Sequence, residues 1–275
     1  MANKDTMTWQ WHRKLGHASF SVLNRLVQFD LVVGLPKIKF TQNEICHACV
    51  RGKQTRNSFK PKHIVSTSKP FDLIHMDLFG PTRTLSLNGK RFGLVLVDDY
   101  SRFTWIFFIF HKNEVFDKFL LFYRRVQTAH GAKVAAIQTD HGGEFENNFF
   151  NEFCDEQGIK HQYSSPRTPE QNRVVERKNR VLTEMARTML AESGLPKKFW
   201  AEAINIACHI LNRAMVRPIL NKTSYELLRG KKPNVSYFRP FRVKYFVHNN
   251  NKENLDKFDS KSELGYFLGY SDTSR

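Results

Sequence analysis

The sequence predicts an α/β protein whose mixed β-sheet carries helices on its faces, preceded by a helical metal-binding segment and followed by a short strand-rich segment. Three strand-like runs occur in succession between residues 71 and 110, and helical and strand-like patterns then alternate. A Cys-x-x-Cys pair and two upstream histidines mark the N-terminal segment. With 275 residues, 41% hydrophobic and 25% charged, the chain is long enough for one or two globular domains and is not of a disordered type.

The first segment is expected to be helical. Residues 8–15 have a helical pattern that a glycine ends, and Ser19 is expected to cap a second helix over residues 20–28. Beyond the cysteine pair, residues 52–63 are basic and contain a proline, as is typical of a linker. We therefore place a first domain at residues 1–69.

The middle segment changes to strands. Runs rich in β-branched and aromatic residues span 71–79, 91–99 and 103–110, and Leu-Asn-Gly-Lys at 87–90 is a turn signal between the first two. An expected helix, strand, helix and strand then follow at residues 113–130, 134–139, 147–157 and 159–163. Adjacent strands followed by this alternation predict a mixed sheet covered by helices.

The last third begins with helices and ends with strands. A loop with two prolines at residues 164–172 precedes a long helix over 173–191, and a further helix extends to about residue 213. We place the second domain at residues 70–229. Strand-like texture returns in residues 233–275, which are too few to form a large third domain.

The charge distribution indicates a polyanionic partner. The net charge is +17, and it divides into +9 for residues 1–69, −2 for 70–172 and +10 for 173–275. Two basic arms flanking a slightly acidic centre are suited to nucleic acid, because each Lys or Arg that neutralises a phosphate releases counterions. The alternative is a basic surface that serves only solubility.

Other classes are not expected. The longest apolar run, residues 103–110, is too short to span a bilayer, so we expect no membrane partner. The first residues lack an apolar signal segment, and four cysteines are too few for a disulfide scaffold. A soluble intracellular protein is the expectation.

The two histidines and the cysteine pair predict a structural zinc site. His12 and His17 form His-x4-His, Cys46 and Cys49 form Cys-x2-Cys, and 28 residues separate the two pairs. Two nitrogen and two sulfur ligands suit tetrahedral Zn²⁺, and a small unit with little core of its own needs such a metal. Incidental histidines beside an unrelated cysteine pair are the alternative.

Three acids are candidates for a divalent-metal site. Asp77 lies in the first expected strand, Asp140 just past the fourth, and Glu176 one turn into the long helix. Carboxylate oxygens bind hard cations, and a pair of Mg²⁺ ions is suited to phosphoryl transfer. Spacing alone does not exclude three scattered acids, and further carboxylates compete for the role, namely Asp98, Asp99 and Glu144.

Ordered motifs along nearly the whole chain resemble the integrases of copia-type long-terminal-repeat retrotransposons. They are WHRKLGHASF, CHACVRGKQTR, FDLIHMDLFGP, VDDYSRFTWIF, TDHGGEF, SSPRTPEQNRVVERKNR, LTEMARTML, FWAEAINIACHILNR and LGYFLGYS. The resemblance implies a His-His-Cys-Cys zinc module, a ribonuclease-H-like catalytic core, and the start of a small β-barrel. It places one Zn²⁺ on His12, His17, Cys46 and Cys49.

The same resemblance implies metal-dependent chemistry on DNA. The catalytic acids fall on Asp77, Asp140 and Glu176, which would hold two Mg²⁺ or Mn²⁺ ions. The implied reactions are 3′-end processing of the element DNA and strand transfer into target DNA. Element ends and target DNA are the implied partners, a homo-oligomer on DNA is expected because two ends must be held together, and the implied location is the nucleus.

Basic residues beside Glu176 are expected to contact DNA phosphates. Arg177, Lys178 and Arg180 place positive charge next to the acids. Arg180 also lies four residues after Glu176, so a local helical ion pair worth about 0.3–0.5 kcal/mol is the alternative.

Three positions depart from the family pattern, and the two glycine positions that are arginine here suggest a degenerate copy. Arg173 and Arg242 stand where glycine is usual, and Val243 where cysteine is frequent. Arginine is tolerated in place of glycine only where φ is negative and the site is open. Two alternatives to an active integrase follow: a non-catalytic zinc and nucleic-acid-binding relic, and a ribonuclease-H-like nuclease, which would not need the zinc module.

Overall fold

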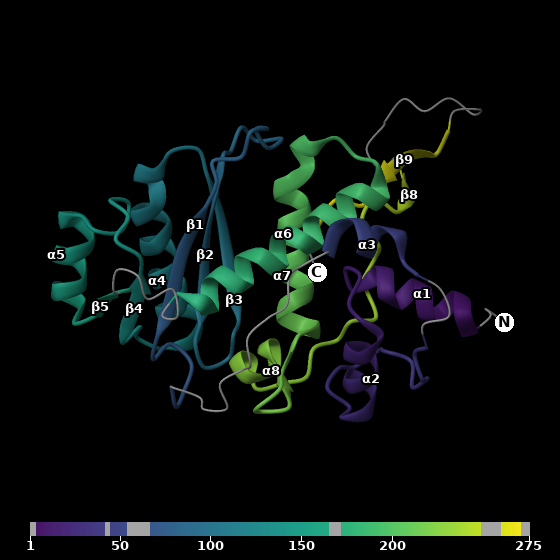
Figure 1. The fold of residues 1–275 in the computed structure, drawn as a ribbon, viewed down its shortest axis with the longest axis horizontal. Coiled ribbons are helices and arrows are strands. Elements are labelled where there is room, and N and C mark those ends of the chain that lie inside the picture. The colour runs from purple at the N-terminus through teal and green to yellow at the C-terminus, as the bar shows by residue number, and fades with distance from the viewer. Residues whose placement is uncertain (1–3, 42–44, 54–66, 165–171, 249–259, 271–275) are drawn as a thin grey trace.

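The computed structural model describes residues 4–41, 45–53, 67–164, 172–248 and 260–270. Its centre is a five-stranded mixed sheet in the order β3-β2-β1-β4-β5 (Figure 1). The strands are β1 Ile74–Phe79, β2 Phe92–Asp98, β3 Thr104–Ile109, β4 Ala136–Thr139 and β5 Lys160–Tyr163. The first three are antiparallel neighbours, whereas β4 pairs parallel with β1, and β5 pairs parallel with β4.

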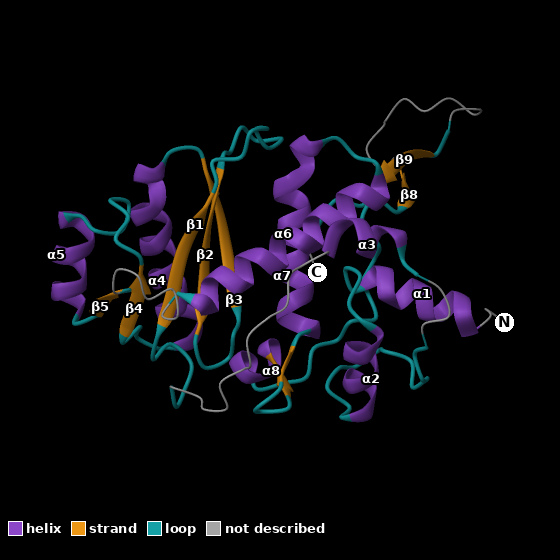
Figure 2. Cartoon of the chain, viewed as in Figure 1, coloured by secondary structure: helices purple, strands orange, loops and turns teal. Residues whose placement is uncertain are grey.

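Helices cover both faces of this sheet (Figure 2). The helices of the described residues are α1 Lys4–Lys14, α2 Phe20–Gln28, α3 His47–Lys53, α4 Val115–His130, α5 Asn148–Gln157, α6 Arg173–Ser193, α7 Trp200–Ala214 and α8 Ser224–Arg229, with short 3₁₀ turns η1 Lys112–Glu114 and η2 Lys197–Phe199. Of these, α1, α2 and α3 lie away from the sheet, beyond α6 and α7 (Figure 1). None of the helices in the described ranges is long and apolar enough to cross a membrane.

Alternation along β2 separates the two cores. Val95 and Val97 join a cluster with α6, α7 and the N-terminal helices, whereas Leu94 and Leu96 join a cluster with α4 and α5. All four side chains are fully buried. Successive strand residues point to opposite faces, so a central strand with apolar side chains on both faces requires cover on each.

Several helices begin or end at the capping residues that their sequences contain. The Ser19 side chain accepts a hydrogen bond from the backbone N–H of Val22 and caps α2, as predicted. Asn147 caps α5 in the same way, and Gly194 ends α6 in a left-handed conformation. The long helix extends two residues beyond its predicted end, and α8 was not predicted. The basic linker predicted at residues 52–63 falls largely outside the described residues.

The N-terminal helices do not have a separate core. Trp11 and Leu15 of the first helical segment belong to the same buried cluster as Met185 of α6 and Ile210 of α7. At Gly16, whose φ is +60°, a Cβ atom would lie 2.5 Å from the Met185 side chain. The first segment is therefore packed directly on the helices of the central unit, and its domain boundary at residue 69 stays a prediction.

The C-terminal segment forms an antiparallel ribbon of β8 Lys244–His248 and β9 Ser262–Tyr266 (Figure 2). A two-residue pair, β6 Val216–Arg217 and β7 Lys222–Thr223, precedes it. Every residue of β8 is exposed, and the described residues of this segment form two strands, not a closed barrel. The start of a barrel is thus represented by a single hairpin.

A half-buried histidine attaches this segment to α7. The His209 ring stacks on Tyr270 with centroids 4.3 Å apart, and its Nε2 lies 2.9 Å from the hydroxyl of Tyr237. Burial, followed by the positive charge of Arg213, lowers the pKa of His209 to about 3. The folded protein therefore keeps this imidazole neutral at pH values where an unfolded chain protonates it.

Acid should loosen this attachment. Because the folded pKa is depressed, the stability contribution of neutral His209 is present above pH 6.5 and is lost as the pH falls toward 3. The free energy of unfolding of the wild type should drop by about 1 kcal/mol more than that of His209→Phe between pH 7 and pH 5.5. Urea denaturation of both proteins at the two pH values measures this difference, and parallel changes would contradict it.

Candidate functional site

The register of two parallel strands sets the first pair of acids together. Ile74 and His75 of β1 pair with Ile137 and Gln138 of β4. Continued by two residues, that register places Asp77 of β1 beside Asp140, the residue after β4. The sequence expectation that a strand interior and a strand end would join two carboxylates is in agreement with this geometry.

Glu176 completes the group from the first turn of α6, which packs across β1 and β2. Burial is the largest cause of a rise in the pKa of Asp77 to about 6, and repulsion from the negative charges of Asp140 and Glu176 adds to the rise. The charges of Asp140 and Glu176 are thus close enough to Asp77 to act on its carboxylate. Carboxylate oxygens suit hard divalent cations. Within the described residues, the group whose ligand atoms lie close enough together to hold a metal ion is a different one, formed by His12, His17, Cys46 and Cys49.

Asn179 is a residue of this site that sequence reasoning missed. Its Nδ2 donates a hydrogen bond to Oδ2 of Asp77 at 2.5 Å, and its own Oδ1 is buried without a hydrogen-bond partner. Asn179 lies three residues after Glu176, on the same face of α6. That spacing was the available signal. The amide fixes one Asp77 oxygen, and the backbone N–H of Leu78 also donates a hydrogen bond to this carboxylate.

Glycine backbone supports Asp140. The N–H of Gly142 donates to Oδ1 of Asp140 at 3.0 Å. A Cβ at Gly142 would lie 3.0 Å from that same oxygen and 2.9 Å from the carboxylate carbon of Glu144. By contrast, a Cβ at Gly143 would meet nothing within 4 Å. A side chain at the first glycine of the TDHGGEF motif would thus displace the Asp140 or Glu144 carboxylate, whereas the second glycine has open space around it.

Glu144 is not available as a fourth acid. Its carboxylate is 11% exposed and forms a 2.9 Å ion pair with the Nζ of Lys112. The pairing neutralises a negative charge that would otherwise lie close to Asp140.

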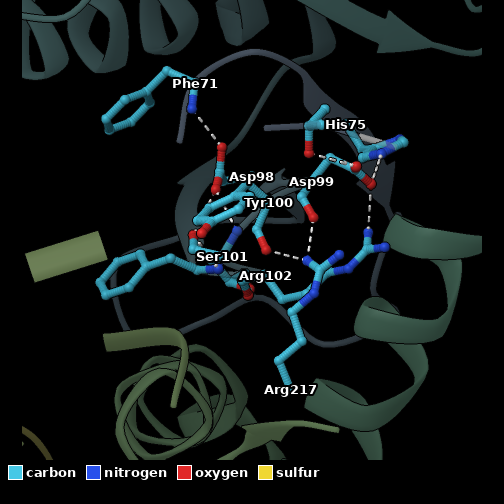
Figure 3. A network of polar contacts seen from close by, with 11 residues as sticks. Phe71, His75, Asp98, Asp99, Tyr100, Ser101, Arg102 and Arg217 are labelled. Carbon is cyan, nitrogen blue, oxygen red and sulfur yellow. Dashed lines mark hydrogen bonds and ion pairs between the residues drawn. The ribbon is translucent and has the colours of Figure 1, made fainter. Parts of the chain in front are cut away.

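Asp98 and Asp99 also have structural partners, shown in Figure 3. Asp98 accepts hydrogen bonds from the backbone N–H of Phe71 and from both the N–H and the hydroxyl of Ser101. These bonds saturate both carboxylate oxygens and hold the turn that follows β2. Asp98 pairs with Ile74 at the start of β1, three residues from Asp77.

Asp99 anchors a second part of this network (Figure 3). Its Oδ1 lies 3.1 Å from Nε2 of His75 and 2.9 Å from Nη1 of Arg102. Arg217 donates to the backbone carbonyls of Asp99 and Tyr100, which ties this turn to β6. Both aspartates are therefore part of the scaffold and not of the acid site.

A second site lies in the N-terminal module. One ligand atom from each of His12, His17, Cys46 and Cys49 lies within 4.8 Å of the others. Nε2 of His12 is 3.4 Å from Sγ of Cys49, and Nδ1 of His17 is 3.4 Å from Sγ of Cys46. Two imidazole nitrogens and two thiol sulfurs converging in this way fit tetrahedral Zn²⁺.

Outer hydrogen bonds select the ligand nitrogens. Nδ1 of His12 lies 2.8 Å from the carbonyl oxygen of Ala18, so that nitrogen carries the proton and Nε2 is left for a metal. Nε2 of His17 lies 2.7 Å from Oε2 of Glu192, so here Nδ1 is left. Arg13 binds the other oxygen of Glu192 at 2.8 Å. His17 has a φ of +60°, a strained backbone that aims its ring at the site.

The cysteine helix is placed by a close backbone contact. A Cβ at Gly52 of α3 would lie 2.2 Å from the hydroxyl oxygen of Thr188 on α6. Only glycine permits this approach, which brings Cys46 and Cys49 to the two histidines. The four predicted ligands are thus brought together by α1, the turn after it, α3 and α6.

Comparisons with known proteins identify two domain families in this chain. Residues 1–54 match the GAG-pre-integrase domain, and residues 67–169 match the integrase core domain. The chain is 34% identical over 265 residues to the retrovirus-related Pol polyprotein from transposon TNT 1-94 of Nicotiana tabacum, covering 95% of this chain and 19% of that protein. It is 31% identical to the Pol polyprotein from transposon RE1 of Arabidopsis thaliana, with 95% and 17% covered.

This chain belongs to the integrase region of copia-type retrotransposon Pol polyproteins. It spans less than a fifth of the length of the curated relatives that it matches. Among solved structures it is similar to a chain of the simian T-cell lymphotropic virus intasome in complex with PP2A regulatory subunit B56 gamma (TM-score 0.50, 22% identity, 80% of this chain and 76% of that one). It is also similar to the HTLV-2 integrase catalytic core with magnesium (TM-score 0.44, 22% identity, 58% and 97%).

The structure corrects one residue of the DNA-contact set predicted for this integrase. Arg177 and Arg180 are exposed on α6, but Lys178 is only 6% exposed. Its Nζ lies 3.6 Å from the sulfur of Met215, and burial lowers its pKa to about 8. Consecutive helical residues point about 100° apart, which turns Lys178 inward between its neighbours. The phosphate-binding role predicted for Lys178 is therefore wrong.

The two arginines at glycine positions of the integrase pattern differ in their backbone. Arg173 is the first residue of α6 and is not among the positive-φ residues, so it carries no left-handed strain. Arg242 has a φ of +63°, which costs about 1 kcal/mol for a residue with a Cβ. Its guanidinium donates to the carbonyl oxygen of Ser193 at the end of α6, a favourable place for a cation.

Zinc removal and ligand loss should have the same effect. The full chain should bind one Zn²⁺, and Cys49→Ser should abolish binding, whereas Cys154→Ala on α5 should not. Glu192→Gln should weaken zinc affinity about 10–100-fold, because it orients His17. Metal analysis and competition with a chelator measure both effects. Full zinc occupancy in Cys49→Ser would contradict the assignment.

The adjacent glycines offer a matched pair for the acid site. Gly142→Ala should displace the Asp140 carboxylate and lower Mg²⁺ or Mn²⁺ affinity by about 10-fold or more, because a metal ligand tolerates little misplacement. Gly143→Ala should leave the affinity unchanged. Calorimetric titration of both variants checks the difference, and equal affinities would contradict the packing argument.

Proposed function

We propose that this chain performs DNA integration: metal-dependent processing of 3′ ends of retrotransposon DNA and their transfer into target DNA. The observation that carries the proposal is the placement of Asp77 beside Asp140 by the β1–β4 register, with the charge of Glu176 on α6 acting on Asp77, in a chain whose residues 67–169 match the integrase core domain. No covalent intermediate on the protein is required for this exchange of phosphodiester bonds.

The three acids are proposed to hold two Mg²⁺ or Mn²⁺ ions. Such ions would activate the attacking oxygen and stabilise the leaving oxygen in phosphoryl transfer. Other residues of the chain position the carboxylates that would hold these ions. Asn179 holds one oxygen of Asp77, Gly142 holds one oxygen of Asp140, and Glu176 is exposed on α6.

DNA is proposed as the substrate and partner. Arg177 and Arg180 are exposed beside Glu176 and carry the positive charge that backbone phosphates require. The +9 and +10 arms supply further attraction. A homo-oligomer is proposed because two DNA ends have to be held for one integration event, and a nuclear location is proposed because target DNA lies there.

One structural Zn²⁺ is proposed in the N-terminal module. The fit rests on the four donor atoms and on the protonation pattern that Ala18 and Glu192 impose on the histidines. Bound zinc would fix α3 against α6, which also carries Glu176.

Two alternatives lead to different outcomes. A ribonuclease-H-like nuclease would cleave DNA without joining it. Such an enzyme would not need the zinc module, so the packing of that module on α6 does not favour this alternative. A non-catalytic relic would bind DNA without either reaction. Arg173 does not favour the relic through backbone strain, since α6 begins normally there.

The deciding experiment uses purified full chain with Mg²⁺ or Mn²⁺ and short duplexes that carry the matching long-terminal-repeat end. Joined products support integration, cleavage without joining supports the nuclease, and salt-sensitive binding alone supports the relic. Gel resolution of labelled strands separates the three outcomes.

Neutral replacements of the acids should abolish DNA joining, and at Asp77 the replacement should also stabilise the fold. Asp140→Asn and Glu176→Gln should abolish joining and retain DNA binding. Asp77→Asn should also raise the free energy of unfolding at pH 7 by about 1–3 kcal/mol without added divalent ions, because burial and two neighbouring charges disfavour the ionised carboxylate.

Asp155→Asn is the matched control, since Asp155 is exposed on α5. It should change neither joining nor stability by a measurable amount. Thermal unfolding of all four variants tests the expected stabilities. A destabilised Asp77→Asn, or joining by Glu176→Gln, would contradict the role given to the acids.

A further inference from the structure

Four aromatic rings form a column that runs from the core to the surface beside the acid site. Phe150 of α5 is fully buried, and its ring centroid lies 6.0 Å from that of His161 on β5. His161 lies 4.2 Å from Tyr163, with ring planes 32° apart. Tyr163 stacks on His141 at 5.1 Å and 18°. The column becomes progressively more exposed along this path.

Its outer end adjoins a proposed metal ligand. His141 directly follows Asp140 in sequence, and its side chain is 46% exposed. Since one face of the imidazole rests on Tyr163, the exposure belongs to the opposite face and the ring edge. Nδ1 lies 3.0 Å from Oε2 of Glu146, which fixes the plane of the ring.

Hydrogen bonds make the column rigid. Nε2 of His161 lies 3.0 Å from the hydroxyl of Thr139, which donates to the carbonyl oxygen of Asp140. The Tyr163 hydroxyl lies 3.1 Å from Nδ1 of His161. Burial lowers the pKa of His161 to about 4, so its ring is neutral at pH 7 and one nitrogen donates while the other accepts. The rings are therefore positioned relative to Asp140.

We infer that the open face of His141 is a stacking site for one unpaired nucleobase of the DNA substrate, adjacent to the phosphate on which the acids act. Every base has a π-face, so a rigid, half-exposed ring at the end of a stack binds bases with little sequence preference. The inference rests on the proposed function for its substrate class. It adds that the DNA end is bound with at least one base released from pairing.

The test measures stacking without catalysis. A duplex with an unpaired 3′ end that carries 2-aminopurine is bound to full-length protein in the Glu176→Gln background, and fluorescence reports stacking of that base. The probe should be quenched on binding. With His141→Ala added, the quenching should be lost and the affinity should fall about 5-fold or more, the lower end expected for one stacked base.

Matched variants separate stacking from charge. His141→Phe keeps a ring and should keep quenching and affinity, whereas His141→Lys supplies a positive charge without a ring and should behave like alanine. His248→Ala alters a histidine on the β8–β9 ribbon, far from β5 (Figure 1), and should have no effect. A fully paired hairpin end should bind wild type and His141→Ala equally.

Several results would overturn the inference: unchanged quenching in His141→Ala, rescue by lysine but not by phenylalanine, or an equal loss in His248→Ala. Joining assays with Glu176 restored give the separate readout. Quenching without joining would refute the proposed function and support the stacking site, and joining without quenching would do the reverse.

Discussion

The packing of α6 between the sheet and the N-terminal module is the constraint on which the rest of this molecule depends. One end of the helix presents Glu176 and Asn179 to Asp77, and the other end presents Glu192 to His17. Sixteen residues of helix separate the two glutamates, about 24 Å. The positions of both sites are therefore set by one rigid helix, and the shared buried cluster holds that helix in place.

The two sites solve opposite electrostatic problems. At the acid site, like charges are brought together, and Asn179, Gly142 and the Lys112–Glu144 pair moderate the repulsion without removing it. At the zinc site, the two imidazoles are oriented by a carbonyl and a carboxylate. Metal ions would stabilise both sites, but the second is already closely arranged, whereas the first still has mutually repelling groups.

Much of the fold and of the two candidate sites was predictable from the sequence, because it depends on local residue patterns. Strand alternation, the Ser19 cap and the order of helices and strands follow from residue type and spacing, and the family motifs add the seven residues proposed as metal ligands. Lys178 was mispredicted because motif position does not state which way a helical residue faces. Asn179 and Glu192 were missed because their roles depend on partners 102 and 175 residues away in the chain.

The contact between Gly52 and Thr188 makes the zinc site vulnerable at a position that binds no metal. A single added methyl group there would push the cysteine-bearing helix off α6 while leaving all four ligands in the sequence. In a chain that accumulates changes, the loss of this glycine would be invisible to any search for ligand residues. Substitutions that would destroy the zinc site are thus not confined to its four ligands. They include residues of the α3–α6 interface that supports the ligands.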